Sequence, residues 1–199
     1  MQDRPSPLAN RVRCDGAILA DPARGLLTGN RGGRLHDARY TIVRRQASRR
    51  WICCALSFKD RRRQVMGAGY TELFFLDEVV ALSAGHRPCF ECRRPAALAF
   101  SAALGGLRAD AIDRRLSQQR GIARRMQAEA LPDGAVVRVG DADLALCGDN
   151  ALPLALSGYG DATPRPSGPV AVLTPATTLQ ALCNGYRPIW HESAGLTRA

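Results

Sequence analysis

The first half of the chain carries short apolar runs separated by glycines and charged residues. These runs are rich in β-branched and aromatic side chains, which is typical of strands. They predict a strand, a glycine turn and a second short strand in 26–37, and further strands at 40–45, 51–58 and 71–76. Residues 1–24 show no such pattern, so we expect them to be irregular.

Helical patterns follow the last of these strands. In DEVVALSAG, residues 77–85, the acidic pair Asp77-Glu78 suits the first turn of a helix and Gly85 suits its end. A second helix is expected to begin near Pro95. Residues 109–130 predict a third helix, because apolar side chains recur along one side of it: Ile112, Leu116, Ala123 and Met126.

The second half of the chain reads mainly as strands. Residues 134–156 predict a β-hairpin or meander, and 157–169 read as a loop rich in Pro, Gly and Ser. A strand at 170–175 and a last helix at 176–185 follow. The predicted fold class is therefore α+β with short antiparallel strands. We expect a basic half, 1–108, and a second half, 109–199, within one compact domain.

The chain also partly repeats itself. When it is shifted by 100 residues, 73–88 lies on 173–188, and both segments predict a strand and a helix that end in Gly-x-Arg-Pro. Chance agreement between two ordinary strand–helix units is the alternative. A true repeat predicts that Arg87 and Arg187 make equivalent contacts.

Positive charge is concentrated in the first half. Residues 1–108 hold 19 Lys and Arg against 9 Asp and Glu, which accounts for the whole formal net charge of +10. All basic residues except Lys59 are arginines, a bias that a GC-rich genome also produces. The uneven distribution favours an anionic partner, nucleic acid being the commonest.

Two further features bear on location and on the cysteines. The chain has no apolar run long enough to span a membrane and no secretory signal at its start, so we expect a cytoplasmic protein. Its seven cysteines are an odd number. In a reducing compartment they favour metal binding or free thiols over disulfides.

The most specific motif is GHRPCFECRR, residues 85–94. Cys89 and Cys92 are two residues apart on a tight turn after Pro88, a spacing that lets two thiolates converge on one tetrahedral zinc ion. A redox pair is an alternative, since a helix begins close behind. Inert cysteines in a turn are another.

These residues carry a resemblance to a known family. The segment ELFFLDEVVALSAGHRPCFECRR, 72–94, resembles the zinc-binding N-terminal domain of the Ada DNA-repair protein, and the resemblance covers about residues 50–95. In that family four cysteine thiolates hold the zinc, and an upstream thiolate accepts a methyl group from damaged DNA phosphate. The resemblance implies one zinc per chain and makes Cys53 or Cys54 the candidate nucleophile.

The upstream ligands depart from the family pattern. The family spaces its upstream cysteines Cys-x-x-x-Cys, whereas this chain has the adjacent pair Cys53-Cys54. Neighbouring residues of a regular strand face opposite ways, so one ion is expected to receive only one of them unless a bulge intervenes. His36 is the first candidate for the remaining ligand, and His86 is the second.

The sequence thus predicts a small bacterial zinc-binding protein with a structural zinc and an arginine-rich surface for nucleic acid, DNA rather than RNA. One alternative is an enzyme, either an Ada-like alkyl acceptor or a metal-dependent nuclease. The other is a protein-interaction module. The residues expected to bind nucleic acid are Arg44, Arg45, Arg49, Arg50, Arg61, Arg62, Arg63, Arg93 and Arg94.

Overall fold

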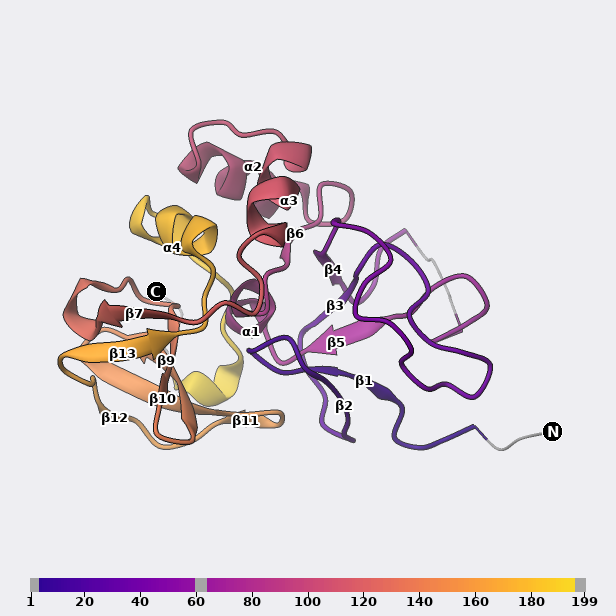
Figure 1. Ribbon diagram of the computed structural model, residues 1–199, viewed down its shortest axis with the longest axis horizontal. Helices are drawn as coiled ribbons and strands as arrows, with labels where there is room; N and C mark the ends of the chain where they lie inside the picture. Colours follow the sequence, from indigo (N-terminus) through magenta and orange to yellow (C-terminus); the bar gives the residue numbers. More distant parts are fainter. Residues whose placement is uncertain (1–3, 60–63, 196–199) are drawn as a thin grey trace.

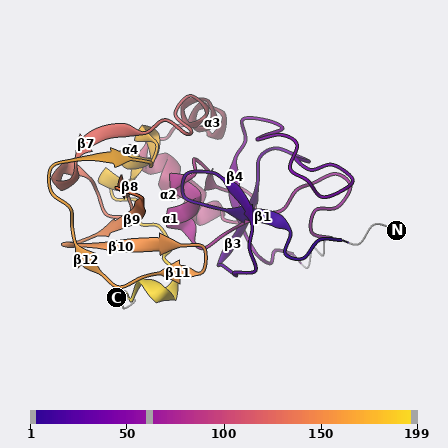
Figure 2. The same cartoon turned by 60° about the horizontal axis from the view of Figure 1, so that its bottom comes forward.

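The α+β fold class is confirmed. The computed structural model describes residues 4–59 and 64–195. Within these ranges it contains one mixed sheet, one antiparallel sheet and four α-helices. Figure 1 shows the sheets side by side, with helix α1 between them. In the turned view of Figure 2, α1 still lies between the sheets.

The first sheet has six strands in the order β2-β1-β5-β3-β4-β6. They are β1 (Ala9–Val12), β2 (Ile18–Ala20), β3 (Leu27–Asn30), β4 (Ile52–Ala55), β5 (Leu73–Phe75) and β6 (Arg87–Pro88). Strand β1 runs parallel to β5, and β4 runs parallel to β6, while the other neighbours are antiparallel. The strands expected at 51–58 and 71–76 are confirmed as β4 and β5, both shorter than predicted.

Two predictions for the first half are wrong. Residues 1–24 are not irregular throughout, because β1 and β2 form an antiparallel pair there and β1 also pairs with β5. Residues 40–45 do not form a strand and contribute only an isolated bridge between His36 and Ile42. Val43 is 60% exposed, and Ile42 is the residue of this segment that packs against the core, so little apolar burial holds the segment in a sheet.

The second sheet is antiparallel. Its strands are β7 (Arg124–Gln127), β8 (Val136–Val139), β9 (Ala142–Cys147), β10 (Asn150–Ala155), β11 (Gly158–Tyr159), β12 (Thr163–Pro164) and β13 (Pro169–Val172). The meander expected at 134–156 is confirmed as β8, β9 and β10. The segment 157–169 is not only a loop, because the short strands β11 and β12 both pair with β10.

The helices are α1 (Glu78–Ser83), α2 (Arg94–Ala103), α3 (Ala109–Ser117) and α4 (Ala176–Cys183), with short 3-10 turns at Ala128–Ala130 and Glu192–Ala194. Asp77 caps α1 through a hydrogen bond from the Val80 N–H. The helix expected at 109–130 is wrong beyond residue 117. Residues 124–127 are strand β7 instead, because they pair with β13 along its whole length. This tertiary pairing outweighs the local helical pattern.

The two repeated segments agree in their helices and helix ends, but not in their strands. The first, 73–88, contains β5 and α1, whereas the second, 173–188, contains α4 and follows β13, which ends at Val172. Both helices end at a glycine with positive φ, Gly85 at 87° and Gly185 at 92°. The His86 N–H donates to the Ala81 carbonyl, as the Tyr186 N–H does to Ala181. Both are Schellman ends, which need a left-handed residue and therefore favour glycine.

The expected equivalence of the two arginines is wrong. Arg87 is buried and donates from Nε and Nη2 to both carboxylate oxygens of Asp113, at 2.9 and 2.8 Å. Arg187 is exposed. The first copy continues into β6, from which Arg87 reaches Asp113 of α3, while residues 187 and 188 join no strand.

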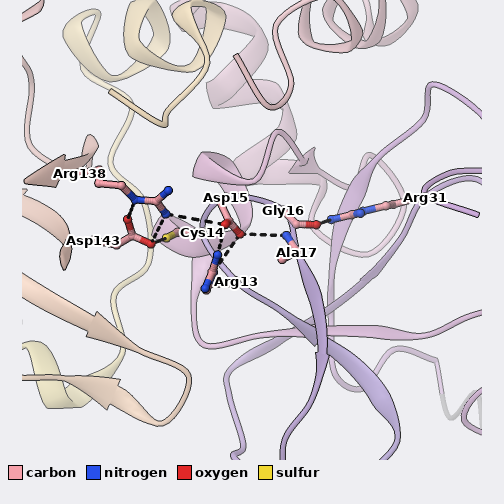
Figure 3. A network of polar contacts seen from close by, with 8 residues as sticks. All are labelled: Arg13, Cys14, Asp15, Gly16, Ala17, Arg31, Arg138 and Asp143. Carbon is pink, nitrogen blue, oxygen red and sulfur yellow. Dashed lines mark hydrogen bonds and ion pairs between the residues drawn. The ribbon is translucent and has the colours of Figure 1, made fainter. Parts of the chain in front are cut away.

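The halves of the chain meet in a shared core and a polar network. One apolar cluster combines Leu76 and Val80 of the first half with Val136 and Leu152 of the second. Figure 3 shows the Cys14 thiol donating to Asp143, which also pairs with Arg138. Burial, reinforced by the Asp143 charge, raises the pKa of Cys14 and keeps its proton in place. The division between residues 108 and 109 stays a prediction.

Candidate metal centre

Three cysteines lie together at the edge of the first sheet. The sulfur atoms of Cys54, Cys89 and Cys92 lie within 4.8 Å of one another. Cys54 is on β4, Cys89 follows β6, and Cys92 lies in the turn before α2. Thiolates bound to one tetrahedral zinc ion are about 3.8 Å apart, given Zn–S distances of about 2.3 Å. This group can therefore hold a metal such as zinc.

Strand pairing brings the three residues together. Strands β4 and β6 are parallel, with Cys53 opposite Pro88, and the Cys89 N–H donates to the Cys53 carbonyl at 3.0 Å. This register places the start of the Cys-x-x-Cys turn beside β4. Because side chains alternate along a strand, only one of the two adjacent cysteines can face the turn.

The sulfur of Cys89 is the most acidic of the three. Its pKa is lowered to about 5, first by a hydrogen bond from Cys54 and also by the backbone N–H groups of Cys92 and Glu91. The same contact with Cys89 is the main cause that raises the pKa of Cys54, and burial raises that of Cys92. Without a metal, one thiolate is thus held by its protonated neighbours. A metal ion would replace those protons.

Cys53 and His36, both expected as ligands, are placed elsewhere. Cys53 is fully buried on the other face of β4, where its sulfur packs with Leu73 and Phe75 and accepts a hydrogen bond from Arg93 at 3.2 Å. The ring of His36 is hydrogen-bonded to the Thr71 hydroxyl at 2.6 Å. Neither belongs to the cysteine group found in the described part of the chain.

His86, the second candidate for the remaining ligand, packs in the interior. Its ring lies 4.9 Å from that of Trp51 and 4.7 Å from that of Phe75, between centroids. The Nε2 atom faces the Nε of Arg31 at 3.3 Å. This ring fills the core below the Cys-x-x-Cys turn, as its place in the repeat suggests.

A pocket of about 380 Å³ adjoins the three cysteines. All three line it, together with apolar side chains such as Phe58 and Phe74 and with the carboxylates Glu72 and Glu91. Three protein ligands leave one position of a tetrahedral zinc ion for a further ligand. Any such ligand would lie beside this pocket.

The arginines expected to bind nucleic acid fall into three groups. Arg44, Arg45, Arg49 and Arg50 are exposed in the segment before β4, and Arg94 is exposed on α2. The prediction that Arg93 belongs to a nucleic-acid-binding surface is wrong, because Arg93 is buried. Its Nη1 lies 2.8 Å from Oε1 of Glu78. The triplet of residues 61–63 lies outside the described residues.

The sequence interpretation missed a second polar feature. Arg31 is 1% exposed and stacks on the fully buried Trp51, with Cζ 3.7 Å from the ring centroid. Arg120 also stacks on this ring, at 4.2 Å. Arg120 lies in the segment 109–130 that was expected to be a helix, and nothing in the sequence joins positions 31, 51 and 120.

Comparison with protein-family models, curated proteins and solved structures gave no match to this chain. The likeness of residues 50–95 to the Ada domain thus rests on the motif itself. Among the helices of the described ranges, none has the length and apolar character needed to cross a bilayer.

Proposed function

We propose that the protein is a small zinc-binding protein that binds nucleic acid, DNA rather than RNA, through an arginine-rich surface. One zinc ion per chain is held by Cys54, Cys89 and Cys92 and has a structural role. The observation that carries the proposal is the grouping of these three sulfurs within 4.8 Å on elements far apart in the sequence.

The charge distribution supports the nucleic-acid part. Four exposed arginines, Arg44, Arg45, Arg49 and Arg50, lie in the segment that leads into β4, the strand that supplies Cys54. A metal that ties β4 to the turn after β6 would stiffen the base of this segment. Arginine is suited to phosphate because its planar guanidinium donates two parallel hydrogen bonds.

The affinity for DNA is expected to fall as salt rises. The log–log slope should be about 0.9 per phosphate neutralised on a duplex. The variant Arg49→Gln/Arg50→Gln should lower this slope by up to about 1.8, since each lost phosphate contact releases one counterion fewer. Fluorescence anisotropy with a labelled duplex and a matched RNA, at several salt concentrations, measures both affinities.

The matched control is Arg125→Gln/Arg187→Gln, which removes two exposed arginines from the second half. It should leave the slope unchanged. Equal slopes for the two double variants, or no retention of DNA and RNA at low salt, would contradict the nucleic-acid part. Zinc content, measured by mass spectrometry, should stay at one per chain in both variants. A protein with zinc but without nucleic-acid binding would favour a protein-interaction module.

The pocket beside the cysteines favours a second candidate, an alkyl acceptor that uses Cys54. In such a reaction the Cys54 thiolate forms a bond to the methyl carbon of a methyl phosphotriester, the carbon–oxygen bond breaks, and a phosphodiester anion leaves. A gain of one methyl group on Cys54, found by peptide mass spectrometry after incubation with methylated DNA, would support it. The described residues offer no cluster of histidines or carboxylates that favours the nuclease alternative.

A further inference from the structure

A group of three arginines surrounds the buried indole of Trp51. The Cζ atoms of Arg31, Arg120 and Arg45 lie 3.7, 4.2 and 5.9 Å from its ring centroid. We call this group, with Trp51 and His86, the arginine cluster. None of its residues lines the pocket beside the three cysteines, so the cluster is a separate site.

The positive charge of the cluster is not neutralised within the described residues. Arg31 donates to neutral acceptors, the Nε2 of His86 at 3.3 Å and the Gly16 carbonyl at 2.9 Å. Arg120 likewise donates to the carbonyls of Gly85 and Arg49, both at 3.0 Å. Burying like charges without a counter-charge is strongly unfavourable.

The two carboxylates that act on the cluster are already paired. Asp113 is held by both nitrogens of the Arg87 fork. Asp15 pairs with Arg13 and lies 3.7 Å from Arg138. Figure 3 shows Asp15 turned toward these two arginines, while Arg31 approaches the Gly16 carbonyl from the other side of the loop.

The pKa values of the two stacked arginines, Arg31 and Arg120, are lowered, which agrees with the lack of a counter-charge beside them. Burial, followed by the charges of Arg45 and Arg120, lowers the pKa of Arg31 to about 9. Burial is also the main cause that lowers the pKa of Arg120 to about 10, although Asp113 opposes it. An anion bound beside Arg31 and Arg120 would raise both pKa values again.

Hydrogen-bond donors also lack partners around the cluster. The buried atoms without a partner in the described part of the chain include Nε1 of Trp51, Nδ1 of His86 and Nη1 of Arg120. The Nε of Arg31 donates to Nε2 of His86, so the proton of the neutral ring is on Nδ1. All three atoms are therefore donors, and buried donors in native proteins nearly always have acceptors.

A cavity and a glycine leave room beside the cluster. A pocket of about 640 Å³ is lined by Gly16, Arg31, Arg44 and Arg45, and also by Asp15, whose carboxylate is paired with Arg13. A Cβ atom on Gly121 would lie 2.9 Å from a guanidinium nitrogen of Arg45, and one on Gly16 would lie 3.9 Å from the same nitrogen. The absence of a side chain at Gly121 leaves the Arg45 guanidinium its place at the cluster, whereas a Cβ atom at Gly16 would make only ordinary van der Waals contact with it.

We propose that the arginine cluster binds one phosphate group, which enters through the pocket over Gly16 and is held by Arg31, Arg45 and Arg120. A phosphate offers several acceptor oxygens and two negative charges, which match the guanidinium groups of the three arginines. The group could be free inorganic phosphate or a phosphate of a nucleic acid. The inference goes beyond the proposed function and does not need it.

The first experiment is calorimetric titration of the protein with inorganic phosphate. Arg45→Gln and Arg120→Gln should each weaken binding about tenfold or more, because each removes a charge-assisted hydrogen bond. Arg125→Gln, an exposed arginine of the second sheet, is the charge-matched control and should bind as the wild type does. No phosphate binding by the wild type at millimolar concentration, or equal binding by Arg45→Gln and Arg125→Gln, would overturn the proposal.

A second measurement uses the unaltered protein, so it does not depend on the folding of a variant. Phenylglyoxal modifies accessible arginines, and peptide mass spectrometry locates the modified residues. Phosphate should reduce modification of Arg45 but not of Arg125. Equal modification of Arg45 with and without phosphate would contradict binding at this site.

The two sources of phosphate are separated with oligonucleotides. Binding through a terminal phosphate predicts that a 5′-phosphorylated strand binds more tightly than its 5′-hydroxyl form, and that Arg45→Gln removes the difference. Phosphate binding without such a difference assigns the site to free phosphate or to a small phosphate ester. If neither inorganic phosphate nor Arg45→Gln changes the affinity for DNA, the proposed function stands, and the arginine cluster does not take part in DNA binding.

Discussion

Cys89→Ser is expected to release the bound zinc and to lower the melting temperature by about 8–16 °C. Loss of a structural metal belongs to the largest class of single-residue effects, above about 4 kcal/mol, and each kcal/mol shifts the melting temperature by about 2–4 °C in a chain of this size. The physical reason is that an ion held by the proposed site would join β4 to the turn after β6, so its binding energy would also be folding energy. Metal content per chain and thermal unfolding by circular dichroism test the expectation. Cys92→Ser and Cys54→Ser should behave alike.

Two other cysteines provide matched controls for this result. Cys53 neighbours Cys54 in the sequence but is buried on the other face of β4, so Cys53→Ser should destabilise the core and keep the zinc. Cys183 is exposed at the end of α4, and Cys183→Ser should change neither quantity. A chelator should lower the melting temperature of the wild type to that of Cys89→Ser. Full zinc content in Cys89→Ser, or zinc loss in Cys53→Ser, would refute the ligand set.

Arg87→Met is expected to destabilise the protein by about 3–5 kcal/mol, because it leaves the buried carboxylate of Asp113 without its partner. The exposed fractions of the two side chains are 7% and 4%, so solvent screens the pair little. Arg187→Met changes the matching position of the repeat, where the side chain is exposed, and should leave stability nearly unchanged. Urea unfolding of both variants measures the difference.

A double variant separates the charge from the packing at this site. Arg87→Met/Asp113→Leu replaces both partners with apolar groups, which in other proteins often restores or exceeds the original stability. Recovery of most of the lost free energy would assign the effect of Arg87→Met to the unpaired carboxylate. Equal losses in Arg87→Met and Arg187→Met would show that the pair contributes nothing specific to the fold.

Capping residues in the sequence predicted where helix α1 begins and ends, whereas the sequence did not predict where distant strands replace a helix or pair. Asp77 and Gly85 mark the two ends of α1, since capping and a left-handed glycine act over one turn. The helix beyond residue 117 was predicted wrongly because the pairing of β7 with β13 lies in contacts about 45 residues away in the chain. Strand β1 was missed although one of its two neighbours, β2, is close in the sequence; the other, β5, is far away.

Some ligands of the candidate metal centre follow from the sequence, and others only from the tertiary structure. The sequence by itself determined that Cys89 and Cys92 form a pair, because two residues on one tight turn are close in any fold that keeps the turn. The tertiary structure decided between Cys53 and Cys54, because the pairing of β4 with β6 sets which side of the strand faces that turn. It also placed His36 beside Thr71 and away from the cysteines.

The distribution of charge also depends partly on the sequence and partly on the tertiary structure. The sequence by itself determined that the excess of positive charge lies in residues 1–108, since a net charge needs no fold to be counted. Only the tertiary structure decided which arginines are solvated and which are buried. Arg31 and Arg120 are 89 positions apart in the sequence, and they meet at Trp51, where Arg31 also donates to the Gly16 carbonyl and Arg120 to the Gly85 carbonyl.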